Sequence, residues 1–587
     1  MKKSIITSLS TILILGFSPI LSQTKTDSYT FQDDYTELSD PAKNNPEEWS
    51  QVKEDINITF ANSNIRYAKK EVPSIVNRTR WKATGWKGEK LNTQLLIWSK
   101  RNLQAITVSM SSLKDKFGNI IDASQIEASF IRYVMTDIYQ PDCVKKNKTN
   151  EVDSSLVADI IDTAKTTFLI ANSVQPVWLS LNIPQDAIPG LYKGSITIQA
   201  DSLIRTLDIN IQVINHTLPN YAHFSFDLDM WQHPAAIARV HQLELWSDAH
   251  FKAMRPYYEI LAKAGQKVIT VAITDEPWGH QTYDDYPGMI RITRKKNGKW
   301  AYDYSLFDKY VSFVKSCGIT QRINCYSMVS WDKKYHYYDE STQKDTSFTA
   351  NTQDIEYREF WLAMLKDFAI HLKQKGWFDK TTVAMDERPL NDMQAALKLL
   401  KEADTDWKVS LAGRYHHELI NDVYDYSVFK TDRFTPEELL QRKIKGWPST
   451  YYTSCEGNFP NLFTFSSPAE AVWLSWQASA KGFTGYLRWA FNSWPKQPLL
   501  DSRFISWPAG DTFQIYPGPR SSVRFEKLIE GIQDFEKIRI LKDIYTNKND
   551  LKSLKRLNNV LSIFENIPSD QNEAIIKLNK AKEVLNK

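Results

Sequence analysis

Residues 56–218 carry short runs in which apolar and polar side chains alternate, and turn-forming residues separate the runs. Alternation with a period of two places the apolar side chains on one face of a β-strand. Several such strands, joined by wide turns rich in Gly and Pro such as Ile183–Gly194, are typical of a β-sandwich. The predicted strands are Thr93–Ser99, Gln104–Ser111, Ala128–Val134, Pro176–Ile183, Gly194–Ala200 and Ile204–Ile214.

From about residue 219 the pattern changes, because apolar strand-like runs begin to alternate with stretches of helical spacing. Eight such units within residues 219–518 predict a (β/α)8 TIM barrel, in which crossover helices join parallel strands. The predicted strands are His223–Met230, Lys267–Thr274, Arg322–Met328, Thr381–Met385, Lys408–Leu411, Val423–Val428, Thr450–Ser454 and Thr484–Trp489. The predicted helices include Ala249–Lys263, Ser305–Ser316, Ile355–Lys375, Asp392–Glu402, Pro436–Arg442 and Ser467–Ala480.

The remaining segments complete a two-domain chain, all-β and then α/β. Residues 519–587 read as helices packed on the barrel, with Ser521–Tyr545 the strongest. Residues 24–55 form a polar segment, expected to be a tether or a strap on the surface, and residues 141–165 are expected to form a long loop. The expected order is therefore β-sandwich, TIM barrel and C-terminal helical extension.

The first 23 residues have the pattern of a secretory signal peptide. Lys2 and Lys3 precede an apolar run, and small or polar residues follow around Ser22. This predicts a secreted or periplasmic protein. No later segment is apolar over about 20 residues, so we expect no integral membrane segment in the mature chain.

Composition excludes some functions and favours another. The chain has 587 residues with 73 basic and 69 acidic side chains, and this balance over a long chain argues against a nucleic-acid partner. The four cysteines lie far apart without metal-ligand spacing, so no metal site or cofactor is predicted, while one disulfide and four free thiols both remain open. Aromatic residues reach 12%, including 19 Trp, and such rings suit the faces of sugars as well as a protein core.

In a TIM barrel the active site lies at the carboxyl ends of the strands, so the residues after each apolar run are the candidates. Carboxylates and Trp side chains converge there, as expected of a glycoside hydrolase with a glycan substrate. Asp386 and Glu387 are predicted to be catalytic. The candidates for substrate binding are Asp229, Trp231, His233, Trp278, Trp331, Arg414, Tyr415, Glu456, Arg488, Trp489, Asn492 and Trp494.

Several of these candidates have a structural alternative. Asp275-Glu276-Pro277 occupies the equivalent place after the second strand and rivals Asp386-Glu387, or forms a salt-bridged loop. His233 is more simply a hydrogen-bonded structural imidazole, and Arg488 can buttress carboxylates from below. Consecutive strand residues point to opposite faces, so Asp386 and Glu387 serve one sugar only if the strand twists or ends there, which Pro389 favours.

A set of motifs in a fixed order resembles glycoside hydrolase family 123. The motifs are Trp86–Glu89, the turn Pro189–Gly194, Val383–Pro389, Gly485–Trp494, Trp507–Asp511, Tyr516–Gly518 and Ser522–Glu536. The resemblance implies an N-terminal β-sandwich, a (β/α)8 catalytic domain and β-N-acetylgalactosaminidase activity. It also implies that Glu387 is the general acid and base and that Asp386 holds the 2-acetamido group of a terminal N-acetylhexosamine.

Three functions remain open at this stage. The first is a substrate-assisted enzyme, in which the acetamido oxygen attacks the anomeric carbon and no protein nucleophile is needed. The second is a retaining β-glycosidase with Glu387 as acid/base and Glu456 as nucleophile, because strands four and seven face each other across many barrels. The third is a non-catalytic carbohydrate-binding protein. The β-sandwich either binds glycan or braces the barrel.

Overall fold

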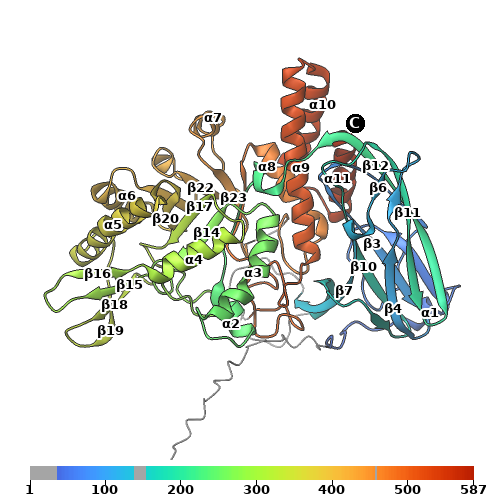
Figure 1. Ribbon diagram of the computed structural model, residues 1–587, viewed down its shortest axis with the longest axis horizontal. Helices are drawn as coiled ribbons and strands as arrows, with labels where there is room; N and C mark the ends of the chain where they lie inside the picture. Colours follow the sequence, from blue (N-terminus) through green and yellow to red (C-terminus); the bar gives the residue numbers. More distant parts are fainter. Residues whose placement is uncertain (1–35, 138–153, 457–458, 505, 587) are drawn as a thin grey trace, which may run out of the picture.

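The computed structural model describes residues 36–137, 154–456, 459–504 and 506–586. A sheet-rich N-terminal region and an α/β barrel lie side by side, and the long helix α9 (Val523–Asn547) stands between them (Figure 1). No helix in these described ranges combines the length and apolarity needed to span a membrane. The predicted signal peptide lies outside the described residues.

Two sheets face each other across one hydrophobic core in the N-terminal region. All six predicted runs form strands. The five-stranded sheet has the order β1-β3-β10-β7-β8, with β1 (Ile56–Ala61), β3 (Lys90–Ser99), β10 (Ser173–Asn182), β7 (Ile126–Asp137) and β8 (Ser154–Ile161). The seven-stranded sheet follows β2-β12-β11-β4-β9, and β5 pairs with β11 while β6 pairs with β5. Its strands are β2 (Arg80–Lys87), β12 (Leu203–Thr217), β11 (Gly190–Ala200), β4 (Leu103–Met110), β9 (Thr167–Leu169), β5 (Leu113–Lys114) and β6 (Ile120–Ile121).

Of the expectations for the connecting segments, the long loop needs correction, whereas the described part of the polar segment agrees with a strap. The loop expected over 141–165 lies partly outside the described residues, but Ser154–Ile161 forms β8 because its alternating side chains pair with β7. The described part of the polar segment contains the short helix α1 (Pro46–Ser50), capped by Asn45. Trp49 is buried and donates a hydrogen bond to the carbonyl of Lys70 over 2.9 Å, so this part is anchored.

All eight predicted barrel strands are present in one parallel sheet of order β13-β24-β23-β22-β21-β20-β17-β14. The ends nearly close, because Leu228 of β13 forms an isolated parallel bridge with Gln266, just before β14. The strands are β13 (Asp227–Met230), β14 (Val268–Ala272), β17 (Arg322–Tyr326), β20 (Thr381–Asp386), β21 (Lys408–Gly413), β22 (Asp425–Phe429), β23 (Ser449–Tyr452) and β24 (Gly485–Arg488).

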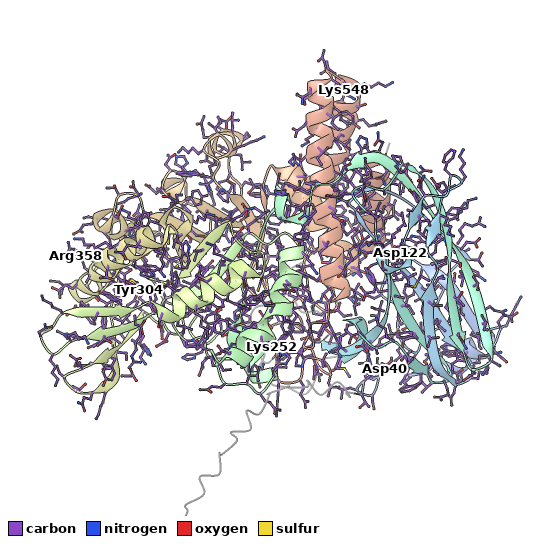
Figure 2. All side chains as sticks on the ribbon, viewed as in Figure 1. Asp40, Asp122, Lys252, Tyr304, Arg358 and Lys548 are labelled. Carbon is purple, nitrogen blue, oxygen red and sulfur yellow. The ribbon has the colours of Figure 1, made fainter. Side chains whose placement is uncertain are left out.

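The predicted helices cover the outside of this barrel. Their bounds are α2 (Pro234–Val240), α3 (Asp248–Lys263), α4 (Ser305–Ser316), α5 (Ile355–Lys375), α6 (Leu390–Ala403), α7 (Pro436–Ile444) and α8 (Pro468–Lys481), of which α2 was not predicted. Figure 2 shows the polar surface of this layer at Lys252 of α3 and Arg358 of α5.

A four-stranded sheet extends from the barrel and was missed by the sequence analysis (Figure 1). Its order is β16-β15-β18-β19, formed by β15 (Arg291–Arg294), β16 (Trp300–Asp303), β18 (Lys334–Asp339) and β19 (Lys344–Thr349). These strands are short, and most of their side chains are only half-buried, so their apolar periodicity is weak.

The helix α9 and the two helices that follow it link the barrel to the N-terminal sheets. The helices α10 (Leu551–Leu561) and α11 (Gln571–Leu585) pack on α8 and α9. Trp86 of β2 donates its indole hydrogen bond to the carbonyl of Leu585 over 3.0 Å. The C-terminal helices therefore contact both the barrel and the first sheet-rich region.

A buried carboxylate joins these parts. Asp159 of β8 has a fully buried side chain and accepts hydrogen bonds from Arg66 (3.0 Å), Tyr516 (2.6 Å) and Arg524 of α9 (2.9 Å). Burial alone would raise the pKa of Asp159, but Arg524 and Arg66 hold it below its ordinary value. The stabilisation is therefore present at neutral pH and is lost as acid protonates the carboxylate.

We expect Asp159→Asn to lower the free energy of unfolding by about 3–5 kcal/mol, because it leaves buried guanidinium groups without their counter-charge. Urea denaturation at pH 7 measures this change. Asp208→Asn is the matched control: it breaks the Arg80–Asp208 ion pair, whose side chains are 48% and 54% exposed, and should cost less than about 1 kcal/mol. Equal losses would contradict a special role of the buried carboxylate.

Candidate active site

A cavity of about 660 Å³ opens at the carboxyl ends of the barrel strands. It is lined by both residues predicted to be catalytic and by six of those predicted to bind substrate. These residues are Asp386, Glu387, Trp231, Trp278, Trp331, Arg414, Glu456 and Trp489.

Asp386 and Glu387 both face this cavity because the strand ends between them. Asp386 is the last residue of β20, and Glu387 has a φ of +46°, in the left-handed region that non-glycine residues rarely adopt. The backbone N–H of Glu387 still donates to the carbonyl of Ala412 over 2.8 Å. A Cβ on the neighbouring Gly413 would lie only 3.3 Å from that nitrogen, so the turn needs the small residue beside it.

Asp386 is a buried carboxyl group with one free oxygen. The indole N–H of Trp331 donates to its Oδ2 over 2.7 Å, while its buried Oδ1 has no hydrogen-bond partner among the described residues. Burial raises the pKa of Asp386 to about 7, with a smaller contribution from the neighbouring Glu387, against the opposing effects of Arg388 and the Trp331 hydrogen bond. The cavity therefore holds a carboxyl group that changes charge near neutral pH.

Glu387 is positioned by Tyr452, a residue that the sequence analysis missed. The Tyr452 hydroxyl donates to Oε1 of Glu387 over 2.8 Å. Burial and the adjacent Glu387 carboxylate raise the pKa of Tyr452 far above its ordinary value, so the phenol keeps its proton. Tyr452 is the last residue of β23, and a search that included strand ends as well as the residues beyond them would have found it.

Aromatic side chains form the walls. The Trp231 and Trp278 rings stack with centroids 5.3 Å apart, and the Arg388 guanidinium lies 4.1 Å from the Trp331 ring centroid. Trp489 donates to Asp511 over 3.2 Å. The cavity residues that were not predicted are Gln281, Arg388, Pro389, Leu390, Ala412, His416, Phe429, Tyr452, Ser454, Cys455, Leu487, Trp507 and Asp511; Cys455 is disulfide-bonded, whereas Cys317 and Cys325 are free and buried.

The other predicted substrate-binding residues do not line the cavity. Arg488 is fully buried and forms a 2.5 Å ion pair with Asp511. It therefore supports a carboxylate from below, which is the alternative role that the sequence analysis gave it. That carboxylate in turn accepts the indole hydrogen bond of Trp489. Arg488 therefore positions the cavity wall from outside the cavity.

His233 and Asn492 hold two loops together. The Asn492 side chain accepts from the backbone N–H of His233 over 3.0 Å and donates to its carbonyl over 2.9 Å. Burial lowers the pKa of His233 to about 4, so the imidazole is neutral. His233 is therefore the structural imidazole that the sequence analysis gave as its alternative role. Both side chains are buried, and neither lines the cavity.

The last three of these predicted residues, Asp229, Tyr415 and Trp494, also lie outside the cavity lining. Asp229 lies inside the barrel, where burial and then Asp425 raise its pKa well above the ordinary value. The Tyr415 hydroxyl donates to Glu438 over 2.8 Å, and the Trp494 indole donates to the carbonyl of Ile515 over 2.7 Å. The fold therefore uses the polar groups of Tyr415 and Trp494. Asp229 receives one contact of 3.5 Å from Gln266 at Oδ1, and its buried Oδ2 has no hydrogen-bond partner among the described residues.

The rival motif after the second strand forms a loop. Both oxygens of Glu276 accept backbone N–H groups, from Tyr286 and from His280. Within the described ranges, one group of possible metal ligands has its atoms within 4.8 Å of one another, namely Glu276, His280 and Asp285. Each Glu276 oxygen already accepts a backbone N–H, and His280 and Asp285 are exposed.

Family comparisons cover most of the chain. The family model described as glycoside hydrolase 123, catalytic domain, matches residues 231–541, and the glycoside hydrolase 123 N-terminal domain matches residues 60–200. The comparison with curated proteins returned no match.

One solved structure is similar over nearly its whole length. It is a family 123 glycoside hydrolase from Clostridium perfringens, described for glycolipid glycan hydrolysis, with 25% identity and a TM-score of 0.83, and the alignment covers 91% of this chain and 98% of that chain. A GH10 xylanase with a bacterial Ig-like domain, from termite gut, has 9% identity and a TM-score of 0.30, with 78% and 100% coverage. The latter similarity is too low to carry an argument.

Because the pKa of Asp386 is raised from an ordinary 3.8 to about 7 in the fold, the free energy of unfolding falls as the pH rises from about 4 to about 7 and stays low above that. Asp386→Asn removes the buried charge and should raise the free energy of unfolding at pH 8 by up to about 4 kcal/mol. The gain should shrink as the pH falls from 7 and vanish toward 4, where the carboxyl group is protonated in the unfolded chain as well as in the fold. Urea denaturation at several pH values measures it.

The control is Asp285→Asn, whose side chain is 90% exposed and which should show no such pH dependence. A stability difference between wild type and Asp386→Asn that is the same at every pH would contradict the raised pKa.

Proposed function

The chain belongs to glycoside hydrolase family 123, and from this premise we propose that it removes terminal β-linked N-acetylgalactosamine from glycans. The proposed mechanism retains the anomeric configuration and uses the substrate's own 2-acetamido group. Glu387 acts as general acid and base, and Asp386 binds the acetamido group. Membership of the family itself supports glycosidase activity, whichever sugar is cleaved.

The observation that carries this proposal is the free oxygen of Asp386. Oδ1 is buried without a partner beside the cavity, while Trp331 fixes Oδ2. An unpaired buried acceptor is costly unless a ligand supplies a donor. The amide N–H of a 2-acetamido group is such a donor, and a plain 2-hydroxyl sugar lacks the carbonyl that the reaction needs.

The reaction then follows from the two carboxyl groups. The acetamido carbonyl oxygen forms a bond to the anomeric carbon as the glycosidic C–O bond breaks, and protonated Glu387 transfers its proton to the departing oxygen. An oxazolinium intermediate results, whose positive charge ionised Asp386 stabilises. Glu387 next removes a proton from water, which attacks the anomeric carbon and restores the acetamido group.

The environment of each group suits its role. Asp386 must be ionised for this role. Its pKa of about 7 is lowered both by the hydrogen bond from the substrate N–H and by the developing positive charge. Tyr452 holds Glu387 by one oxygen, which leaves the other available to the leaving group. The Trp side chains around the cavity offer flat faces for the sugar ring.

The substrate and location are part of the same proposal. The similar Clostridium perfringens enzyme is described for glycolipid glycan hydrolysis, which supports a glycoconjugate carrying a terminal N-acetylhexosamine. The signal-like pattern of residues 1–23 supports export to the periplasm or the medium.

One observation favours a second mechanism. Glu456 lines the same cavity as Glu387, so a retaining β-glycosidase with Glu456 as nucleophile has the necessary carboxylates.

If the acetamido group is the nucleophile, nitrophenyl β-N-acetylgalactosaminide should be hydrolysed while nitrophenyl β-galactoside is not. The two substrates share a leaving group, so kcat/KM isolates the contribution of the 2-substituent. Nitrophenyl β-N-acetylglucosaminide, assayed beside them, reports the preference at C4. Comparable rates on the galactoside would rule out substrate assistance.

The two mechanisms predict opposite orders for the loss of kcat in Asp386→Asn and Glu456→Gln. Asp386→Asn should lower kcat on the order of a hundredfold or more in the substrate-assisted mechanism, whereas Glu456→Gln should have a modest effect. A thiazoline analogue should bind far more tightly than substrate. A sugar found esterified to Glu456 by mass spectrometry after treatment with a fluorosugar would establish the second mechanism instead.

A further inference from the structure

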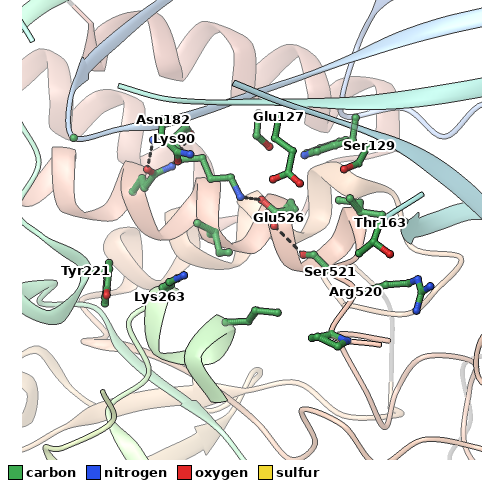
Figure 3. Close-up of a pocket in the computed structure, with 18 of the residues that line it drawn as sticks. Lys90, Glu127, Ser129, Thr163, Asn182, Tyr221, Lys263, Arg520, Ser521 and Glu526 are labelled. Atoms are coloured by element: carbon green, nitrogen blue, oxygen red, sulfur yellow. Dashed lines mark hydrogen bonds and ion pairs between the residues drawn. The ribbon is translucent and has the colours of Figure 1, made fainter. Parts of the chain in front are cut away.

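A second cavity, of about 500 Å³, lies where the N-terminal sheets, the barrel and α9 meet (Figure 3). It shares no lining residue with the active-site cavity. Tyr221 and Lys263, on its barrel side, precede the amino ends of β13 and β14. The cleft is therefore at the end of the barrel opposite the active site, and a ligand there leaves the catalytic cavity open.

The outer face of the five-stranded sheet changes character at this cleft. Ile131, Tyr133 and Met135 of β7 belong to a hydrophobic cluster that Val523 of α9 joins. Further along the same outer face, β7 carries Ser129 and Glu127, and β10 carries Ser180 and Asn182. These four residues line the cleft and do not fill it. Small polar residues at a domain seam leave a cavity that apolar side chains would have closed.

Four side chains of the cleft have unused hydrogen-bonding capacity. Glu127, Asn182 and Lys263 are exposed, and Ser129 is 4% exposed. None of the four has a side-chain hydrogen bond or ion pair to another residue within the described ranges. In Figure 3, Glu127, Ser129 and Asn182 lie on one side of the Lys90–Glu526 pair, and Tyr221 and Lys263 lie on the other.

The other charged groups are already neutralised within the protein. Lys90 pairs with Glu526 over 2.5 Å, and Arg520 pairs with Asp162 over 2.8 Å. With Glu127 and Lys263 the lining has three cations and three carboxylates. This balance gives an anion or a cation no advantage, and it suits a neutral ligand that both donates and accepts hydrogen bonds.

We propose that this cleft is a non-catalytic binding site for a neutral mono- or disaccharide unit of a glycan. Sugar hydroxyl groups donate to the Glu127 carboxylate and exchange hydrogen bonds with Asn182 and Ser129. The apolar edge of the sugar ring contacts the exposed Tyr221, which lines the cleft. Its volume is in the usual range for small-molecule sites. The choice of a sugar as the neutral ligand rests on the proposed function.

The test is hydrogen–deuterium exchange of the full-length protein with millimolar N-acetylgalactosamine, galactose or lactose. At least one of these sugars should slow exchange in peptides covering 126–131 and 178–182. Glu127→Ala should reduce the apparent affinity for this protection roughly tenfold or more, because a charged hydrogen-bond acceptor is lost. Glu71→Ala, another exposed carboxylate outside the cleft, is the matched control and should retain it.

The active site supplies an internal reference in the same experiment. Glu127→Ala should leave kcat and KM on the nitrophenyl substrate unchanged. Protection confined to peptides around 381–390 with all three sugars would overturn the second site and leave the proposed function intact. Protection of the cleft peptides without turnover of any nitrophenyl glycoside would support the cleft while contradicting the proposed hydrolase activity.

Discussion

The buried ion pair between Asp159 and Arg524 is the interaction on which the arrangement of the chain depends. Asp159 belongs to the N-terminal sheet and Arg524 to α9, and Arg524 also donates to the carbonyls of Gly510 (3.0 Å) and Phe513 (3.0 Å). Asp511, which follows Gly510 in the chain, pairs with Arg488 and accepts the indole hydrogen bond of Trp489. Trp489 forms a wall of the active-site cavity. A charge in the N-terminal region thus helps to fix the catalytic cavity, because a buried charge must keep its partners.

The active site itself is built at a local cost to stability. Glu387 adopts a left-handed backbone conformation, and Asp386 is buried with an oxygen that no described residue satisfies. Either feature alone is unfavourable in a protein interior. Together they turn two consecutive carboxyl groups toward one cavity and raise the pKa of Asp386 to about 7. The surrounding hydrogen bonds from Trp331 and Tyr452 hold the pair in that geometry.

The seam between the N-terminal sheets and the barrel has two chemically different parts. Around Val523 it is apolar and packed, so the sheets brace the barrel. Around Ser129 and Asn182 it is polar and open, which fits a binding surface. The alternatives of bracing and of glycan binding that the sequence left open are therefore compatible, because they concern different residues of the same outer sheet face.

Periodicity alone determined most of the fold, because a strand or helix that buries one face must repeat its apolar residues at a set spacing. All eight barrel strands and the Asp386-Glu387 motif at the end of β20 were predictable in this way, whereas the half-exposed strands β15, β16, β18 and β19 outside the barrel had too weak a pattern. The use of each rim side chain was decided by tertiary structure. Arg488 ends β24, and Trp489 and Asn492 follow it. Arg488 and Asn492 bond to Asp511 and His233, while Trp489 reaches the cavity. Which partner a polar side chain meets depends on residues distant in sequence, and local spacing carries no record of them.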